Sequence, residues 1–199
     1  MNELKFLELK IDRLNEASAL MHRIFHEYNA EGCTEESIQI FKRLTSPESF
    51  SEFLEARDKI DKFFNMWVCV DTSSDEIVGV LSAYYDMLDN FFVDGRYHRR
   101  GIARQLFNMM LEYFNPAVIK VSASLYAVDF YRRLGFTDEK EAVINKGMNV
   151  IMMKYHHEGG KHSNYQELFL LMDKVREKYG DEKAKEILEK SVKQLNESV

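Results

Sequence analysis

Proline and cysteine are scarce in this sequence, and it contains no long apolar run. The 199 residues include two prolines and two cysteines, and so few prolines argue against a long disordered linker. Cys33 and Cys69 form no motif, so we interpret both as packing residues of a protein in a reducing, cytoplasmic compartment. The apolar segments are too short to span a membrane, and the opening residues MNELKFLELK lack the apolar core of a signal peptide. We therefore expect no membrane partner and no disulfide framework.

An excess of positive charge is also missing. The formal net charge of −6 at pH 7 argues against a general nucleic-acid-binding protein, although residues 96–104 are locally basic. Hydrophobic residues make up 45% of the chain and aromatic residues 13%, which is enough for one well-filled core. We expect one main domain of class α+β (mixed α/β) over residues 1–155, a helical extension over residues 156–199, and no nucleic-acid partner.

The spacing of apolar residues predicts both strands and helices along residues 1–155. Alternation of Leu7, Leu9 and Ile11 predicts a first strand, and Asn15 is the expected N-cap of the helix that follows it. Two more helices are expected to start at Thr34 and at the Ser46-Pro47 pair. An antiparallel hairpin of strands is expected next, over residues 66–70 and 77–85. A third strand follows over residues 88–93, then a helix over 102–115, a strand over 118–121 and a helix over 126–134. The last strand pair is expected from residue 136 onward and over residues 148–155.

The segment from Val93 to Arg104 joins a strand to a helix through a short basic turn. Gly101 has no side chain and Ala103 only a methyl group, so a ligand can approach the backbone closely. A helix N-terminus beside such a turn is suited to a phosphate, and so are the cations that surround it, Arg96, Arg99, Arg100 and Arg104. The alternative is a solvated basic turn before a surface helix.

A second segment makes the interpretation of this turn more specific. Residues 127–136 read Ala-Val-Asp-Phe-Tyr-Arg-Arg-Leu-Gly-Phe and match the pattern A-x-x-F-Y-x-x-x-G-F in full. The turn itself, His98-Arg99-Arg100-Gly101-Ile102-Ala103, resembles the pattern Gln/Arg-x-x-Gly-x-Gly/Ala. Together the two segments are similar to the GNAT superfamily of acetyl-CoA-dependent N-acetyltransferases. The resemblance covers roughly residues 4–155 and implies a central, twisted, mostly antiparallel sheet with flanking helices.

The resemblance also implies roles for particular residues. Tyr131 falls on the position of the tyrosine that protonates the leaving CoA thiolate, and acetyl-CoA is the implied co-substrate. The backbone of residues 91–93 would face the pantetheine arm of acetyl-CoA, and residues 99–104 would surround its pyrophosphate. Ser124 stands at the position where many members carry an asparagine that contacts the cofactor. The implied cofactor-binding residues are Phe91, Phe92, Val93, Arg99, Arg100, Gly101, Ile102, Ala103, Arg104 and Ser124.

Three positions depart from the family pattern. His98 replaces the usual Gln or Arg, Gly95 stands where Pro is common, and the strand before the turn has no obvious glutamate to act as the general base. Asp89 and Asp86 are the candidate bases because both lie in or just before that strand. Each could instead be a turn aspartate without a role. Tyr131 could likewise be a core residue of a short helix, although the motif favours catalysis.

No metal site is expected. His22 and His26 are four residues apart on a predicted helix, but no adjacent glutamate completes a zinc motif, so we interpret them as a surface pair. In the C-terminal extension, Gly159 and Gly160 predict a hinge. A capping box at Ser163 and Asp181 as a second cap predict a helical hairpin. That hairpin could form a homodimer, cover the acceptor cleft or simply extend the core.

These features predict an N-acetyltransferase that transfers the acetyl group directly to a primary amine of a small molecule or peptide. Helices between Thr34 and Leu54 would shape the acceptor side, where Phe41, Phe50 and Phe53 offer apolar contact or belong to the core. The alternative is a non-catalytic acyl-CoA-binding sensor or interaction protein on the same fold. No residue in the sequence identifies the amine.

Overall fold

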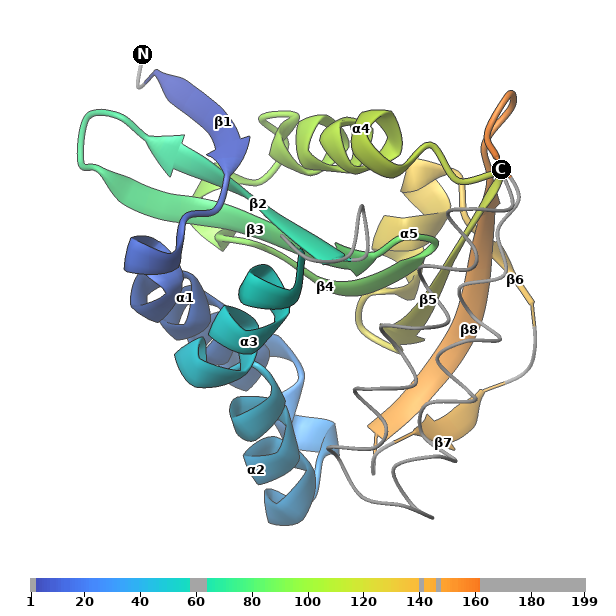
Figure 1. The fold of residues 1–199 in the computed structure, drawn as a ribbon. Coiled ribbons are helices and arrows are strands. Elements are labelled where there is room, and N and C mark those ends of the chain that lie inside the picture. Colours follow the sequence, from blue (N-terminus) through green and yellow to red (C-terminus); the bar gives the residue numbers. More distant parts are fainter. Residues whose placement is uncertain (1–2, 58–63, 140–141, 146–147, 162–199) are drawn as a thin grey trace.

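A computed structural model describes residues 3–57, 64–139, 142–145 and 148–161 (Figure 1). Its sheet has eight strands in the order β1-β2-β3-β4-β5-β8-β6, with β7 paired to β8. The strands are β1 Leu4–Glu8, β2 Phe64–Asp71, β3 Glu76–Tyr84, β4 Met87–Val93, β5 Val118–Ser124, β6 Thr137–Asp138, β7 Val143–Asn145 and β8 Met148–His156. All strand pairs in the described residues are antiparallel except β4 with β5. The prediction of a mixed α/β fold with a mostly antiparallel sheet is therefore confirmed.

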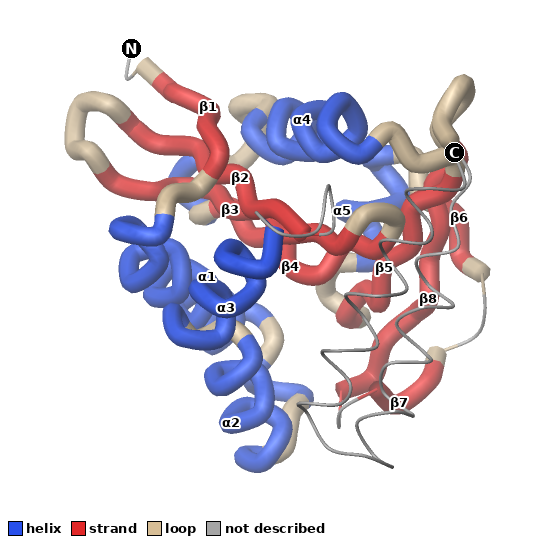
Figure 2. Tube along the Cα trace, in the orientation of Figure 1, coloured by secondary structure: helices blue, strands red, loops and turns tan. Residues whose placement is uncertain are grey.

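Helices cover both faces of this sheet. In Figures 1 and 2, α1, α2 and α3 lie on one face of the sheet, and α4 and α5 lie on the other. Their bounds are α1 Leu14–Tyr28, α2 Glu35–Leu44, α3 Pro47–Arg57, α4 Ile102–Phe114 and α5 Val128–Leu134. No helix in the described part of the chain is both long and apolar enough to cross a membrane.

Strand β2 is buried along its whole length because it lies between the two helical layers. Successive side chains of a strand point to opposite faces, and β2 follows this rule. Trp67 and Cys69 pack in the cluster that contains α4 and α5. Met66 and Val68 pack in the cluster that contains α1 and α3. Burial on both faces explains why this strand has a nearly continuous apolar sequence.

The predicted helix starts are confirmed at two places and wrong at one. The Thr34 hydroxyl accepts a hydrogen bond from the Ser37 N–H, and the Ser46 hydroxyl accepts one from the Ser49 N–H. Asn15 is not a cap, because α1 already starts at Leu14 and its N-cap position is Arg13. The first strand also ends at Glu8, before Ile11, and a 3-10 turn over residues 11–13 follows it.

The N-terminal turn of α4 approaches strand β3 very closely at Gly79. A Cβ atom added there would lie 2.9 Å from Ile102 Cγ2 and 3.3 Å from Leu106 Cδ1. Both side chains are fully packed in the core. The absence of a side chain at Gly79 therefore sets how near α4 lies to the sheet.

Gly160, one of the two glycines of the predicted hinge, lies in a turn that is bonded to the main domain. The His157 N–H donates to the Ala117 carbonyl and the Lys161 N–H donates to the Asn115 carbonyl, so residues 157–161 form a turn held against residues 115–117. A side chain at Gly160 would collide with the Pro116 backbone. The predicted hairpin after Ser163 lies outside the described residues. Its three possible roles, a homodimer contact, a cover over the acceptor cleft or an extension of the core, stay predictions.

Gly79→Ala should lower the free energy of unfolding by about 2 kcal/mol, because the added methyl group overpacks a rigid contact with Ile102. Urea denaturation measures this. Gly95→Ala is the matched control: its added Cβ would meet the Tyr28 hydroxyl at 2.9 Å, and that hydroxyl ends a side chain that can move aside, so the change should stay within about 0.5 kcal/mol. Equal losses in the two variants would contradict the assigned role of Gly79.

Candidate active site

Strands β4 and β5 are neighbours that pair for only two residues. Their parallel register contains Met87 with Lys120 and Leu88 with Val121, and no later pair. On its other edge β4 pairs with β3, where the register shifts because Asp89 is an extra residue between Leu88 and Asn90. Such a bulge bends a strand. The sheet therefore opens beyond Leu88, and the edge of β4 that faces β5 is left for a ligand.

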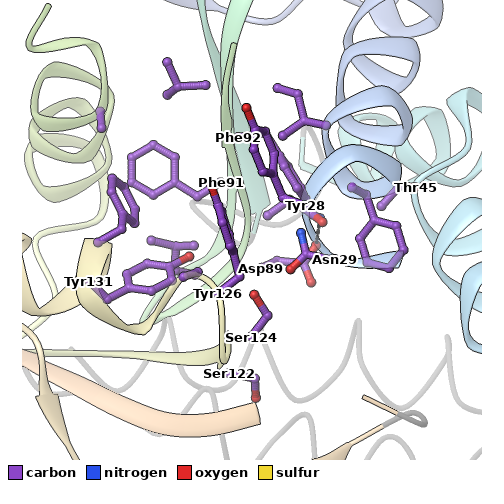
Figure 3. Close-up of a pocket in the computed structure, with 18 of the residues that line it drawn as sticks. Tyr28, Asn29, Thr45, Asp89, Phe91, Phe92, Ser122, Ser124, Tyr126 and Tyr131 are labelled. Carbon is purple, nitrogen blue, oxygen red and sulfur yellow. Dashed lines mark hydrogen bonds between the residues drawn. The ribbon is translucent and has the colours of Figure 1, made fainter. Parts of the chain in front are cut away.

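A cavity of about 1050 Å³ lies in this opening. Residues of α1, α2 and α3 line it from one face of the sheet, and residues of α4 and α5 line it from the other. In Figure 3 Tyr28 and Thr45 lie on one side, Tyr131 lies on the other, and Phe91 and Phe92 of β4 lie between them. The cavity thus passes through the sheet from one helical layer to the other.

The N-terminus of α4 forms one end of the cavity. Gly101 is its N-cap with φ of 79°, a left-handed conformation that favours glycine, and no side chain caps the helix there. The first intrahelical bond runs from the Gln105 N–H to the Gly101 carbonyl, so the N–H groups of residues 102–104 have no partner within the helix. No atom lies within 4 Å of a Cβ placed on Gly101. This end is open and suited to an anion, with Arg99 and Arg104 beside it.

The cavity brings together most of the residues that the sequence predicts for cofactor binding. Nine of the ten line it, namely Phe91, Phe92, Val93, Arg99, Gly101, Ile102, Ala103, Arg104 and Ser124. Arg100 is the exception, since its guanidinium lies 5.2 Å from the centre of the Tyr97 ring and its side chain is not part of the cavity wall. The ring of His98 bonds to the Val93 carbonyl through Nε2, at 3.0 Å.

Arg96 does not face the cavity, because it is bonded to Asp94. Asp94 is 2% exposed, and Arg23 of α1 bonds to Oδ2 at 2.5 Å while Arg96 bonds to the same atom at 2.9 Å. Burial alone would raise the pKa of Asp94, but hydrogen bonds from the Arg96 side chain and backbone and from Arg23 lower it to about 2. The carboxylate therefore stays charged and links α1 to the start of the basic turn.

Tyr97 fixes the middle of the same turn. Its hydroxyl donates to Asp71 Oδ2 at 2.7 Å, and the other carboxylate oxygen of Asp71 accepts from the Ser73 N–H at 2.9 Å. Both Tyr97 and Asp71 are buried. The turn that carries Arg99 and Gly101 is thus attached to the end of the β2–β3 hairpin, and its conformation is set before a ligand binds.

Tyr131 faces the cavity from α5 (Figure 3). It is 5% exposed and packs against the rings of Phe91, Phe130 and Phe136, with ring centres 6.5, 5.1 and 5.3 Å away. Burial raises the pKa of Tyr131, and the negative charge of Asp89 raises it further. The phenol therefore holds its proton throughout the physiological pH range, as a proton donor must.

The two candidate bases differ in position. Asp89 lines the cavity at the bulge of β4, where its carboxylate accepts from Asn90 Nδ2 at 2.6 Å and from the Ser82 hydroxyl at 3.3 Å. Asp86 is not among the cavity residues, and burial raises its pKa to about 6 despite the nearby Lys120. Of the two, Asp89 has the geometry to meet a substrate.

Of the three aromatic residues expected on the acceptor side, Phe41 and Phe53 line the cavity, whereas Phe50 is a core residue. Two further cavity residues give no signal in the sequence: Tyr28 at the end of α1 and Tyr126 after β5 stack with ring centres 4.8 Å apart, and both line the cavity. Tyr28, Phe41 and Phe53 are apolar-stripe residues by their spacing, so only tertiary packing distinguishes a cavity wall from a core position.

The predicted histidine pair is split by the fold. His22 Nε2 lies 2.9 Å from the Thr45 hydroxyl, whereas His26 is exposed. Within residues 3–57, 64–139, 142–145 and 148–161, no group of three or more His, Cys, Asp or Glu side chains could hold a metal ion.

The family profile of the acetyltransferase (GNAT) domain matches residues 12–157, most of the chain. The chain belongs to the GNAT acetyltransferase family. It is therefore an acyltransferase, and its fold is the one expected from the two motifs. No curated protein sequence is significantly similar to the chain.

Solved structures of GNAT proteins share this fold. A GCN5-related N-acetyltransferase from Rhodopseudomonas palustris has a TM-score of 0.63 at 16% identity, over 79% of this chain and 98% of its own. The PaiA N-acetyltransferase of Thermoplasma acidophilum, solved in complex with coenzyme A, has a TM-score of 0.61 at 15% identity, over 78% and 99% of the two chains. The ribosomal-protein-S5-alanine acetyltransferase of Vibrio fischeri has a TM-score of 0.58 at 17% identity, over 81% and 97%. At such identities the likeness shows the fold alone.

Asp94→Asn should lower the free energy of unfolding by about 2 kcal/mol at neutral pH, because the lowered pKa of a buried carboxylate measures its stabilisation. That stabilisation is complete above the ordinary pKa of 3.8 and is lost as the pH falls toward about 2. Urea unfolding at neutral and acidic pH should show the two proteins converging in that window.

The control for this experiment is Asp75→Asn, which removes a carboxylate that is 86% exposed and paired with Arg13. Its effect should stay below about 0.5 kcal/mol. A difference between wild type and Asp94→Asn that persists unchanged at the lowest pH would contradict the electrostatic role of Asp94.

Proposed function

We propose that the chain transfers an acetyl group from acetyl-CoA directly to a primary amine. The observation that supports this is the single cavity that joins the N-terminus of α4 to Tyr131 through the opening between β4 and β5. An anion-binding end, an unpaired strand edge and a proton donor follow one another in that cavity. A CoA thioester presents a pyrophosphate, an extended amide chain and a leaving thiol in the same order.

The donor end fits such a molecule in chemistry and in shape. The N–H groups of residues 102–104 and the cations Arg99 and Arg104 suit the pyrophosphate. Alternate backbone groups of Phe91 to Val93 point away from β3 toward the opening, where an amide chain can hydrogen-bond to them as an added strand would. Ser124 lines the facing side, on β5.

In the reaction the amine nitrogen forms a bond to the thioester carbonyl carbon, and the carbon–sulfur bond breaks. A backbone N–H near Phe92 is suited to stabilise the charge that develops on the carbonyl oxygen. Tyr131 donates its proton to the leaving sulfur, and the proton that the nitrogen loses after attack passes to solvent, which reprotonates Tyr131. Asp89 pairs with the incoming ammonium and accepts the proton that it must lose before attack, directly or through water.

Release of the CoA thiol in the presence of a panel of amines tests the proposal. Thiol release that depends on an added amine supports it. Tight acetyl-CoA binding with no amine-dependent release across the panel would favour the rival function, a non-catalytic acyl-CoA-binding protein.

Tyr131→Phe should lower kcat by about 100-fold, because it removes the proton donor without changing the size of the ring. The Kd of acetyl-CoA, measured by calorimetry, should stay within about twofold of wild type. Tyr155→Phe is the control, since Tyr155 packs between Phe107 and Phe136 away from the cavity wall, and it should retain full turnover. Unchanged kcat in Tyr131→Phe would remove the general-acid assignment.

A further inference from the structure

The part of the cavity on the side of α1, α2 and α3 has an aromatic wall, and we refer to it as the acceptor chamber. Phe25 and Phe41 are stacked with ring centres 3.9 Å apart, and Phe41 meets Phe92 edge to face at 6.0 Å. Phe53 and Tyr84 form a second edge-to-face pair at 5.4 Å. The chamber is bounded by Phe25, Phe41, Leu44, Phe53, Tyr84 and Phe92. Its walls suit a flat or slender apolar body.

The charges around the cavity are distributed unevenly. Among the described residues that line it, Asp89 is the single carboxylate. The cations are Arg99, Arg104 and Arg133, which lie at the turn before α4, on α4 and on α5. The acceptor chamber is bounded by α1, α2, α3 and β-strand residues, and those of its lining residues that the structure describes carry no second acid. One ammonium group can therefore be paired there, at Asp89.

Asp89 is held at the junction of the chamber with the donor end. It is the bulged residue of β4, and Asn90 and Ser82 hydrogen-bond to its carboxylate. The neighbouring residues Phe91 and Phe92 turn to opposite faces of the sheet: Phe91 packs with Phe130, and Phe92 packs with Phe41. An amine paired with Asp89 thus has the proton donor on one side and the aromatic chamber on the other.

We propose that the acceptor is a primary monoamine with an apolar aryl or alkyl body, and not a polyamine. This rests on the proposed acetyl transfer. The ammonium nitrogen loses two protons in all, one before it bonds to the acetyl carbon and one afterwards. The sulfur released from that carbon takes up one proton, so an ammonium ion and the thioester yield an amide, a thiol and one free proton. A second ammonium group in the chamber would lose its hydration shell, and the described residues that line the chamber include no second carboxylate to pair with it.

The test compares matched amines by kcat/KM, measured as CoA thiol release. Pentylamine and putrescine have the same length and differ in one end group, a methyl in place of an ammonium. Pentylamine should exceed putrescine by about 100-fold, because the distal ammonium is desolvated without a partner. Phenylethylamine should be at least as good as pentylamine, since its ring stacks on the chamber wall. A peptide with an N-terminal alanine should be a poorer acceptor than either monoamine.

A variant that adds a carboxylate to the chamber tests the cause of the preference. Leu44 lines the chamber and is 41% exposed, so Leu44→Glu can fold and place a second acid there. It should raise the putrescine-to-pentylamine ratio of kcat/KM by about tenfold. Ile11→Glu is the control, because Ile11 is 52% exposed and is not a cavity residue; its ratio should equal that of wild type.

The outcomes distinguish a failure of the proposed class of amine from a failure of the proposed acetyl transfer. Putrescine or the peptide accepted as well as pentylamine by the wild-type protein would overturn the monoamine class while leaving acetyl transfer intact. No increase in the ratio for Leu44→Glu, or an equal increase for Ile11→Glu, would overturn the role given to the chamber. Absence of thiol release with every amine, despite acetyl-CoA binding, would overturn the proposed function itself.

Discussion

Strands β4 and β5 stop pairing beyond Leu88 and Val121. Every part of the site depends on this separation of two neighbouring strands. Backbone groups at the edge of a strand need partners. In β4 the bulge at Asp89 bends the chain away from β5, so these groups face a cavity instead of another strand. The same bulge sets a carboxylate at the place where the opening begins. One extra residue thus accounts for both the strand edge that faces the cavity and the charged group beside it.

The basic turn shows how a loop with several cations is kept in one conformation. Asp94 and Asp71 are both buried, and each is bonded to a residue of the turn, Arg96 and Tyr97. Buried carboxylates with charged or hydroxyl partners are costly to rearrange, so the turn is fixed before any phosphate arrives. Of the arginines in this segment, Arg96 contributes to structure while Arg99 and Arg104 face the cavity. Charge alone does not tell these roles apart.

Local patterns made much of the fold predictable. The caps at Thr34 and Ser46, the hairpin of β2 and β3 and the left-handed Gly135 after α5 follow from residue types at short spacing. The two motifs likewise select nine residues that the structure places on the wall of one cavity. Contacts between residues far apart in the sequence could not be predicted, such as Arg23 with Asp94 or Tyr28 with Tyr126. The cap expected at Asn15 is wrong: Arg13 bonds to Glu16, and α1 starts at Leu14, two residues earlier than an N-cap at Asn15 would allow.

The passage of the cavity through the sheet also bears on where two reactants can bind. The residues that line it belong to α4 and α5 on one face and to α1, α2 and α3 on the other, and the two sets meet at β4. In the proposed reaction the thioester would lie against the first set and the amine against the second. The two reactants would then occupy different parts of one cavity at the same time, as direct transfer without a covalent acyl-enzyme requires.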